Sequence, residues 1–210
     1  MIKKGGAQRI LADLRSARAL VIHTPDEDRQ TLVDHLKRLG CTVSAAWPLP
    51  AALPPDVDTI FIQVEDIPYE QIATVLDGRN PAIIAIVTYE SPTSLKAIVD
   101  LNAHGVLSKP LRLAGVLNQF ALARYRHGFE KRLTAKVSKL EETLKGRRLV
   151  DKAVKLLMRM NELEEDIAYQ RLREQATAHR LPMTQVAQTI VSAHEILGGS
   201  NLTLSSTPQK

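Results

Sequence analysis

Four polar positions in the first half of the chain are of residue types that could take part in chemistry, and they stand at or just after apolar runs. Gln63 and Thr88 each end an apolar run, and Lys109 follows a third run. The uncharged amide of Gln63 is a poor nucleophile and forms no acyl phosphate. Glu65 lies on the same side of an extended strand as Gln63. Acceptor chemistry at Glu65 is not favoured, because no metal-binding acidic pair would neutralise the phosphate.

No other pattern in the sequence indicates an enzyme. There is no nucleophile–base set, no metal-ligand spacing and no phosphate-cradling glycine loop. The six histidines are scattered and are most simply structural or solvated. We therefore predict a protein without catalytic activity, metal or cofactor.

The second half of the chain has a different charge. Residues 111–210 hold 17 Lys and Arg against 10 Asp and Glu, whereas residues 1–110 hold 11 against 13. A near-neutral front and a basic back indicate two different roles, and the back is the better place to meet a polyanion. On charge alone, a solvated helix rich in lysine explains the pattern equally well.

Alternating apolar runs and helix-like segments must position the polar residues of the first half. Strands are predicted at residues 19–23, 41–46, 59–64, 82–88 and 105–108, with helices over 26–39, 69–77 and 91–103. The proline-rich segment 47–58 holds one helical turn at most, so the second helix of the alternation is reduced or missing. Strands that are apolar on both faces predict a flavodoxin-like α/β domain with a five-stranded parallel sheet.

Beyond Pro110 the pattern is helical throughout. An a/d seam about two heptads long follows the first helical stretch, and it consists of Leu133, Val137, Leu140 and Leu144. This seam is either the contact of a dimeric coiled coil or one face of a helix packed within the molecule. Its polar flanks favour the coiled coil.

Three helices are predicted after the seam, over residues 147–160, 162–179 and 182–198. Asn161 and Glu164 have the spacing of a capping box at the start of the second helix. Pro182 is suited to open the third helix, and His194 is expected on its inward face. Residues 199–210 are rich in Ser and Thr and are expected to be disordered.

The first half resembles the receiver domain of bacterial response regulators. Lys109 before Pro110 and Thr88 at the end of the fourth strand carry the resemblance, which implies that both hold a phosphoryl group. The metal-binding acidic pair of that family is missing, because HTP at 23–25 ends the first strand and DED at 26–28 begins a helix. The acceptor aspartate aligns with Gln63. The resemblance implies a pseudo-receiver, in which Lys109 pairs with a local acid or retains a cis turn.

The second half resembles the ANTAR domain, the three-helix RNA-binding output of transcription antiterminators. Its first helix matches at Arg147, Val150, Ala153 and LLM at 156–158. The later helices match at Ala168, Tyr169, Leu172, Arg173, Ala176, Val186 and Ala187. The family usually has lysine directly after the first alanine, where this chain has Val154.

The resemblance implies that this domain reads paired hairpins in a leader transcript. Sequence-specific RNA readers mostly engage unstacked loop bases, on which an aromatic ring stacks. Without the resemblance, Tyr169 would be read as packing on the third helix and Arg173 as a surface ion pair. With it, the RNA-binding candidates are Arg147, Arg148, Lys152, Lys155, Tyr169, Arg173, Arg180 and Gln185.

Together these segments are similar to the amidase-operon family of antitermination regulators. The predicted organisation is an N-terminal extension (1–17), a receiver-like domain (18–122), a coiled-coil linker (123–146), an ANTAR domain (147–198) and a disordered tail (199–210). The resemblance implies hairpin binding that prevents a terminator, a homodimer, and control by a ligand-sensing negative regulator that resembles periplasmic binding proteins. The alternative is a DNA-binding response regulator with a degenerate receiver.

The cellular compartment follows from what the chain lacks. Cys41 is the single cysteine, so no internal disulfide forms. No signal peptide and no apolar run of about 20 residues is present. A cytoplasmic protein without a membrane span is predicted.

Overall fold

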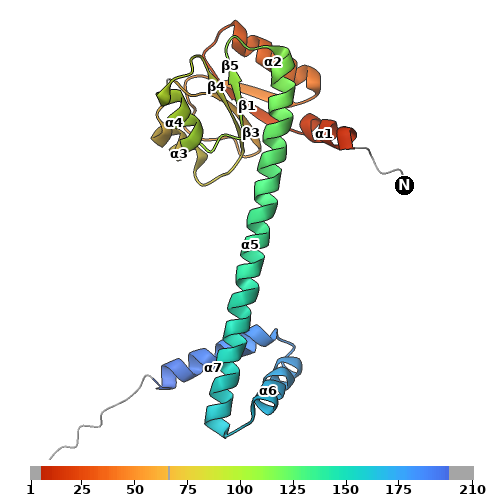
Figure 1. The fold of residues 1–210 in the computed structure, drawn as a ribbon, viewed down its shortest axis with the longest axis vertical. Coiled ribbons are helices and arrows are strands. Elements are labelled where there is room, and N and C mark those ends of the chain that lie inside the picture. The colour runs from red at the N-terminus through yellow and green to blue at the C-terminus, as the bar shows by residue number, and fades with distance from the viewer. Residues whose placement is uncertain (1–5, 66, 199–210) are drawn as a thin grey trace, which may run out of the picture. The chain divides into compact units, whose positions relative to one another are not determined.

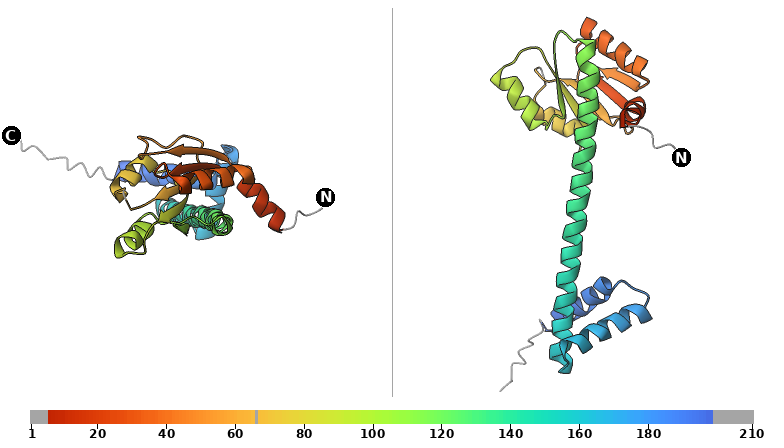
Figure 2. Two further views of the ribbon diagram at one scale, coloured as in Figure 1. Left: turned by 90° about the horizontal axis from the view of Figure 1, so that it is seen from above. Right: turned by 45° about the vertical axis from the view of Figure 1, so that its right-hand side comes forward.

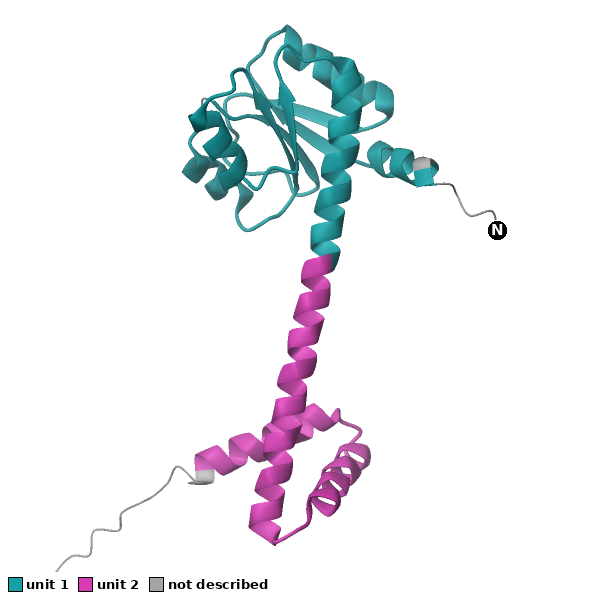
Figure 3. Ribbon diagram, in the orientation of Figure 1, with its two compact units in different colours: residues 1–132 teal, residues 133–210 magenta. Residues whose placement is uncertain are grey.

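The computed structural model describes residues 6–65 and 67–198. The chain divides into two compact units, residues 1–132 and 133–210 (Figure 3). One helix, α5 (Leu113–Asn161), contributes its beginning to the first unit and its end to the second (Figure 1). The disordered tail predicted for residues 199–210 lies outside the described residues.

A five-stranded parallel sheet forms the centre of the first unit, which confirms the predicted fold class. The strands are β1 (Arg18–Ile22), β2 (Thr42–Ala46), β3 (Thr59–Gln63), β4 (Ala82–Val87) and β5 (Gly105–Ser108), in the order β2-β1-β3-β4-β5. Every residue of β3 and β4 is buried, which explains why both strands are continuous apolar runs in the sequence. In the register Val21 faces Phe61, and Phe61 faces Ile84.

Helices cover both faces of the sheet (Figure 2). They are α1 (Gly6–Arg15), α2 (Glu27–Leu39), α3 (Tyr69–Leu76), α4 (Pro92–Asp100) and the start of α5. No helix forms between β2 and β3, as the proline-rich segment there predicted. Asp26 caps α2 by accepting a hydrogen bond from the Arg29 amide, and Gly40 ends this helix at a φ of 97°.

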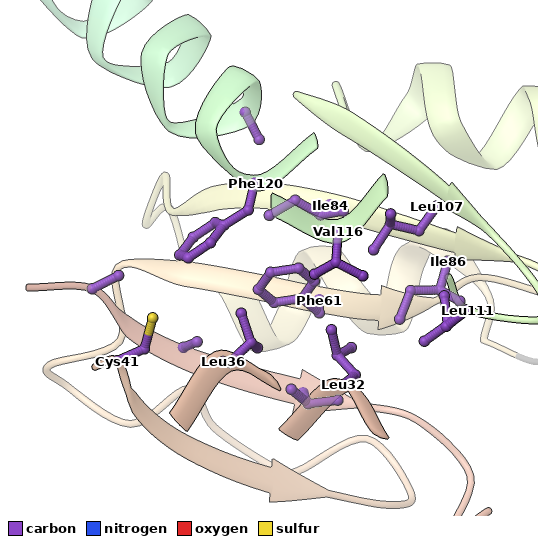
Figure 4. Close-up of a cluster of buried hydrophobic side chains, with 14 of the residues drawn as sticks. Leu32, Leu36, Cys41, Phe61, Ile84, Ile86, Leu107, Leu111, Val116 and Phe120 are labelled. Carbon is purple, nitrogen blue, oxygen red and sulfur yellow. The ribbon is translucent and has the colours of Figure 1, made fainter. Parts of the chain in front are cut away.

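Helix α1 was not predicted, because residues 1–17 were assigned only as an N-terminal extension. Leu14 and Ala17 are fully buried in the core between the sheet and helices α2 and α5. In the same core the rings of Phe61 and Phe120 meet edge to face, with centroids 5.4 Å apart (Figure 4). The extension is therefore part of the first unit.

Arg124 links α1 to the rest of the first unit through two ion pairs. Its guanidinium lies 2.7 Å from Asp13 on α1 and 2.8 Å from Asp58 before β3. It also donates a hydrogen bond to the Thr59 hydroxyl. The hydrogen bond to Asp13 is the main cause that raises the pKa of Arg124. Cys41 lies nearby in the core, where its thiol donates to the Leu14 carbonyl and burial raises its pKa.

The second unit packs the end of α5 against α6 (Glu165–Ala178) and α7 (Met183–Gly198), so a three-helix region follows the receiver-like unit as predicted. Its core is small and made of short aliphatic side chains. These are Ala153, Val154, Leu156, Ala168, Leu172, Ala187 and Val191.

Two details predicted for the second unit were wrong. Asn161 and Glu164 form no capping box, because Asn161 is the last residue of α5. Glu162 follows it at a φ of 51°, and the Leu163 amide donates back to the Met158 carbonyl, as in the usual left-handed ending of a helix. His194 is exposed, because Ala187 and Val191 hold the inward face of α7.

Within residues 6–65 and 67–198, the structure has no helix with the length and apolarity that a membrane crossing requires.

Candidate nucleic-acid interface and degenerate phosphoryl site

Gln63 lies at the carboxyl edge of the sheet, where β3 ends, and is almost fully buried. Its side-chain oxygen accepts a hydrogen bond from the Thr24 hydroxyl at 3.1 Å and a longer one from the Thr24 amide at 3.4 Å. Thr24 follows β1, where the resemblance expected an acidic residue. The amide at the acceptor position is therefore held by a neutral partner.

Lys109 is engaged by two carboxylates from the start of α2. Its ammonium lies 2.8 Å from Asp26 and 3.5 Å from Asp28. Partial desolvation works against the charge of Lys109, but the two acids outweigh it and raise its pKa. Desolvation likewise raises the pKa of Asp26, but the hydrogen bonds from Lys109 and the Arg29 amide lower it to about 2. The bond from Lys109 to Pro110 is cis.

Thr88 directly follows β4, which pairs with β3, and its backbone amide donates to the Glu65 carboxylate. The second carboxylate oxygen of Glu65 is buried and accepts no hydrogen bond within the described residues. Gln63, Thr88 and Lys109 thus each have a side-chain partner from the chain itself. The contacts of Gln63 and Lys109 occupy their side chains, whereas the contact of Thr88 uses its backbone amide and not its hydroxyl.

Tyr169 is the centre of the candidate interface in the second unit. It lies on α6, is 44% exposed, and lines two pockets. The Lys155 pocket is lined by Asp151, Val154, Lys155, Met158, Glu165 and Tyr169. The Arg147 pocket is lined by Glu142, Thr143, Gly146, Arg147, Val150, Asp151, Tyr169, Met183 and Thr184. The structure therefore brings Arg147, Lys155 and Tyr169 together.

The other RNA-binding candidates do not line these pockets. Lys152 forms an ion pair of 2.6 Å with Glu195 on α7, and this contact lowers the pKa of Glu195. Arg173 is exposed one turn beyond Tyr169 on α6. The remaining candidates, Arg148, Arg180 and Gln185, are exposed as well.

Several residues of the pockets were not singled out from the sequence, and Asp151 and Gly146 are two of them. Asp151 lines both pockets, although its position four residues from both Arg147 and Lys155 was visible in the sequence. Gly146 lines the Arg147 pocket where α5 meets the start of α7, and a Cβ on it would lie 3.0 Å from the Thr184 methyl group. A side chain at this position would require the Thr184 methyl group to shift by a few tenths of an ångström.

The a/d seam lies on the part of α5 that belongs to the second unit. Leu133, Val137, Leu140 and Leu144 are between 47% and 64% exposed, and every residue from 131 to 145 is exposed. The alternative that this face packs within the molecule therefore does not apply to the described chain.

Comparison with known proteins identifies the family. Residues 17–124 match the family model of the AmiR N-terminal domain, and residues 138–191 match that of the ANTAR domain. The aliphatic amidase regulator of Pseudomonas aeruginosa is 32% identical over 188 residues, which span 88% of this chain and 96% of that protein.

The chain belongs to the AmiR family of ANTAR-domain regulators.

This AmiR-type protein is an RNA-binding antitermination regulator, and its ANTAR domain implies binding to RNA hairpins. Among solved structures, the response regulator StyR superposes with a TM-score of 0.52 at 13% identity, over 85% of this chain and 99% of StyR. That likeness shows the fold alone. A receiver domain from a diguanylate cyclase of Desulfovibrio desulfuricans G20 reaches a TM-score of 0.48 at 19% identity, over 55% of this chain and 98% of that domain.

Proposed function

We propose that this AmiR-type protein binds two hairpins of a leader transcript as a dimer, prevents the terminator stem from forming, and is controlled by a partner protein instead of phosphorylation. The observation that supports RNA binding best is the exposed ring of Tyr169 between a pocket with Arg147 and a pocket with Lys155. An exposed aromatic stacks on any unpaired base, and the flanking cations meet phosphates. The other exposed candidates are Arg148, Arg173 and Arg180, which extend the basic surface, and Gln185, which adds a polar amide.

Dimerisation through the a/d seam accounts for the use of two hairpins. The seam residues are apolar and exposed, which is costly unless a second helix covers them. A dimer holds two ANTAR domains on one transcript, so weak single contacts gain from effective concentration. Binding then shifts the population of the transcript away from the terminator stem, with no bond chemistry.

Control by a ligand-sensing partner is proposed because the side chains of Gln63 and Lys109 already have internal partners and the site lacks an acidic pair. Thr24 holds Gln63, Glu65 holds the Thr88 amide, and Asp26 holds Lys109. Since no acidic pair remains to bind Mg²⁺, the site has no means to accept a phosphoryl group. We infer that the first unit is a docking scaffold for a negative regulator that resembles periplasmic binding proteins and releases the dimer when it binds a small amide.

The test is a gel shift with the two-hairpin leader RNA and with promoter duplex DNA. We expect the protein to retard the leader RNA and not the promoter duplex. Tyr169→Ala should weaken RNA binding roughly 5- to 150-fold. Tyr89→Ala is the matched control, because Tyr89 is 75% exposed but belongs to the first unit. Binding to the duplex alone would favour the DNA-binding alternative and refute the proposal.

A further inference from the structure

Asp151 occupies an unusual place for an acid on a surface that binds a polyanion. Asp151 and Tyr169 are the two residues that line both the Lys155 pocket and the Arg147 pocket. Glu142 and Glu165 each line one of the pockets only, and Glu165 lies in the first turn of α6, where a negative charge stabilises the helix. Asp151 is therefore the one acid that shares both pockets with the aromatic ring.

The carboxylate of Asp151 has no structural task within the described residues. It lies in the interior of α5, so it caps no helix end. Arg147 and Lys155 stand four residues before and after it, a spacing that often gives an ion pair. No ion pair or hydrogen bond of its carboxylate exists in the described part of the chain, and the side chain is exposed.

A free carboxylate repels phosphates, so its use in an RNA interface must be at a base edge. An ionised Asp only accepts hydrogen bonds, and its two oxygens can take two parallel N–H groups. Guanine is the RNA base whose Watson–Crick edge presents two adjacent donors, N1–H and N2–H. Adenine and cytosine present an amino group beside an acceptor nitrogen, which the carboxylate would repel.

We propose that Asp151 reads a guanine in the hairpin loop, by accepting two hydrogen bonds from its Watson–Crick edge while Tyr169 stacks on an unpaired base. Arg147 and Lys155 bind the phosphates on either side. This inference rests on the proposed RNA-binding function, because it assigns the base that the same interface selects.

The experiment selects hairpins with a fixed stem and a randomised loop on the full-length chain. The wild type is expected to enrich loops with a guanine at one position. In the best of these hairpins, inosine, which lacks the N2 amino group, then replaces that guanine. We expect the wild type to bind the guanine hairpin roughly 5- to 150-fold more tightly than hairpins with another base there, and the inosine hairpin to fall between them.

Asp151→Asn is the decisive variant, because one oxygen is exchanged for an amino group that faces a donor of guanine. It should bind the guanine hairpin more weakly and no longer distinguish guanine from inosine. Asp151→Glu should retain part of the preference. Glu141→Gln is the matched control, since it removes the same charge from an exposed position of α5 outside both pockets and should behave as the wild type.

The outcomes separate the inference from the proposed function. If the wild type selects hairpins but Asp151→Asn keeps the same guanine preference, or no loop position favours guanine, the inference is wrong and RNA binding stands. If the wild type selects no hairpin, both fall. Asp151 also lies one heptad beyond Leu144, in register with the seam. If Asp151→Asn forms a weaker dimer in sedimentation but keeps the base preference of the wild type, Asp151 instead forms an ion pair with a second copy. That result would overturn the inference.

Discussion

The charged side chains of the two units are used in opposite ways. In the first unit, Arg124 binds Asp13 and Asp58, and Lys109 binds Asp26 and Asp28, so each of these two largely buried cations is matched by two acids. In the second unit, Lys152 is the one Lys or Arg with an ion pair among the described residues. The other cations there face solvent.

This difference separates charges that hold a fold from charges that are available to a ligand. A matched charge in a partly buried place stabilises the folded state and is lost to outside partners. An unmatched, exposed cation adds little to stability and remains available to phosphates. The first unit therefore has the charge pattern of a closed scaffold, and the second that of an open binding surface.

The largest expected effect is the loss of RNA affinity when dimerisation of the second unit is disrupted. Leu140→Asp places a charge in the a/d seam, so the dimer should dissociate. Affinity for the two-hairpin RNA should then fall by about 10²- to 10⁴-fold, while affinity for one hairpin stays the same. Sedimentation equilibrium and filter binding measure both quantities. Ser138→Asp, next to the seam but outside it, is the control; a Leu140→Asp variant that stays dimeric contradicts the prediction.

Removal of Arg124 tests whether matched charges hold the first unit. Arg124→Ala leaves Asp13 and Asp58 without their partner and should lower the free energy of unfolding by roughly 2–3 kcal/mol. Arg18→Ala, which removes an exposed pair with Asp56, should cost less than about 1 kcal/mol. Urea unfolding followed by the fluorescence of the single tryptophan, Trp47, reports on this unit alone. Equal losses in the two variants would refute the distinction.

A smaller effect is expected on the free energy of unfolding at acid pH, through Asp26. Because the folded-state pKa of Asp26 is about 2, below its ordinary value of 3.8, its contribution is complete above about pH 4 and disappears as the pH falls toward 2. Asp26 is 37% exposed, so screening limits this contribution to less than about 1 kcal/mol.

Asp26→Asn isolates that contribution. The gap in unfolding free energy between the wild type and this variant should narrow as the pH is lowered from neutral to about 3, in urea titrations followed at Trp47. A gap that stays constant over this range would show that the contact between Asp26 and Lys109 adds nothing through the charge of Asp26.

No effect is expected on phosphorylation when the acceptor position alone is restored. Gln63→Asp restores a carboxylate at the acceptor position, but residues 23–25 supply no acidic pair and Asp26 already holds Lys109. Incubation with acetyl phosphate and Mg²⁺ should leave the intact mass of the variant unchanged, as for the wild type. A stoichiometric phosphoryl adduct would show that the closed site opens more easily than its internal contacts indicate.

The parallel sheet could be predicted because buried parallel strands are apolar on both faces, as Ala82–Val87 is. Helix α2 could be predicted from its periodicity together with the ending at Gly40. Both signals are local. The wrong capping box at Asn161 and Glu164 shows the limit of local patterns, since the same polar residues fit either the end of one helix or the start of the next.

Features that depend on distant partners could not be predicted in the same way. Among the residues of α1 whose burial is described, Leu14 alone is buried, and the anchor of the helix, Arg124, is far along the chain. The pocket around Tyr169 joins α5 to α6, so the place of Asp151 at the ring became visible only in the fold. The sequence named Tyr169, Arg147 and Lys155, and the structure shows which of the candidates lie together.

The single buried cysteine gives this protein a built-in reporter of local opening. A thiolate is the species that alkylating reagents attack, and Cys41 is 7% exposed with a raised pKa. Its thiol donates to Leu14 of α1, so labelling requires α1 to lift or the first unit to open. The second unit has no native thiol. The rate at which Cys41 is alkylated, with and without a docking partner, would therefore report how often the first unit opens locally. The measurement needs no engineered probe, and the RNA-binding unit contributes no signal.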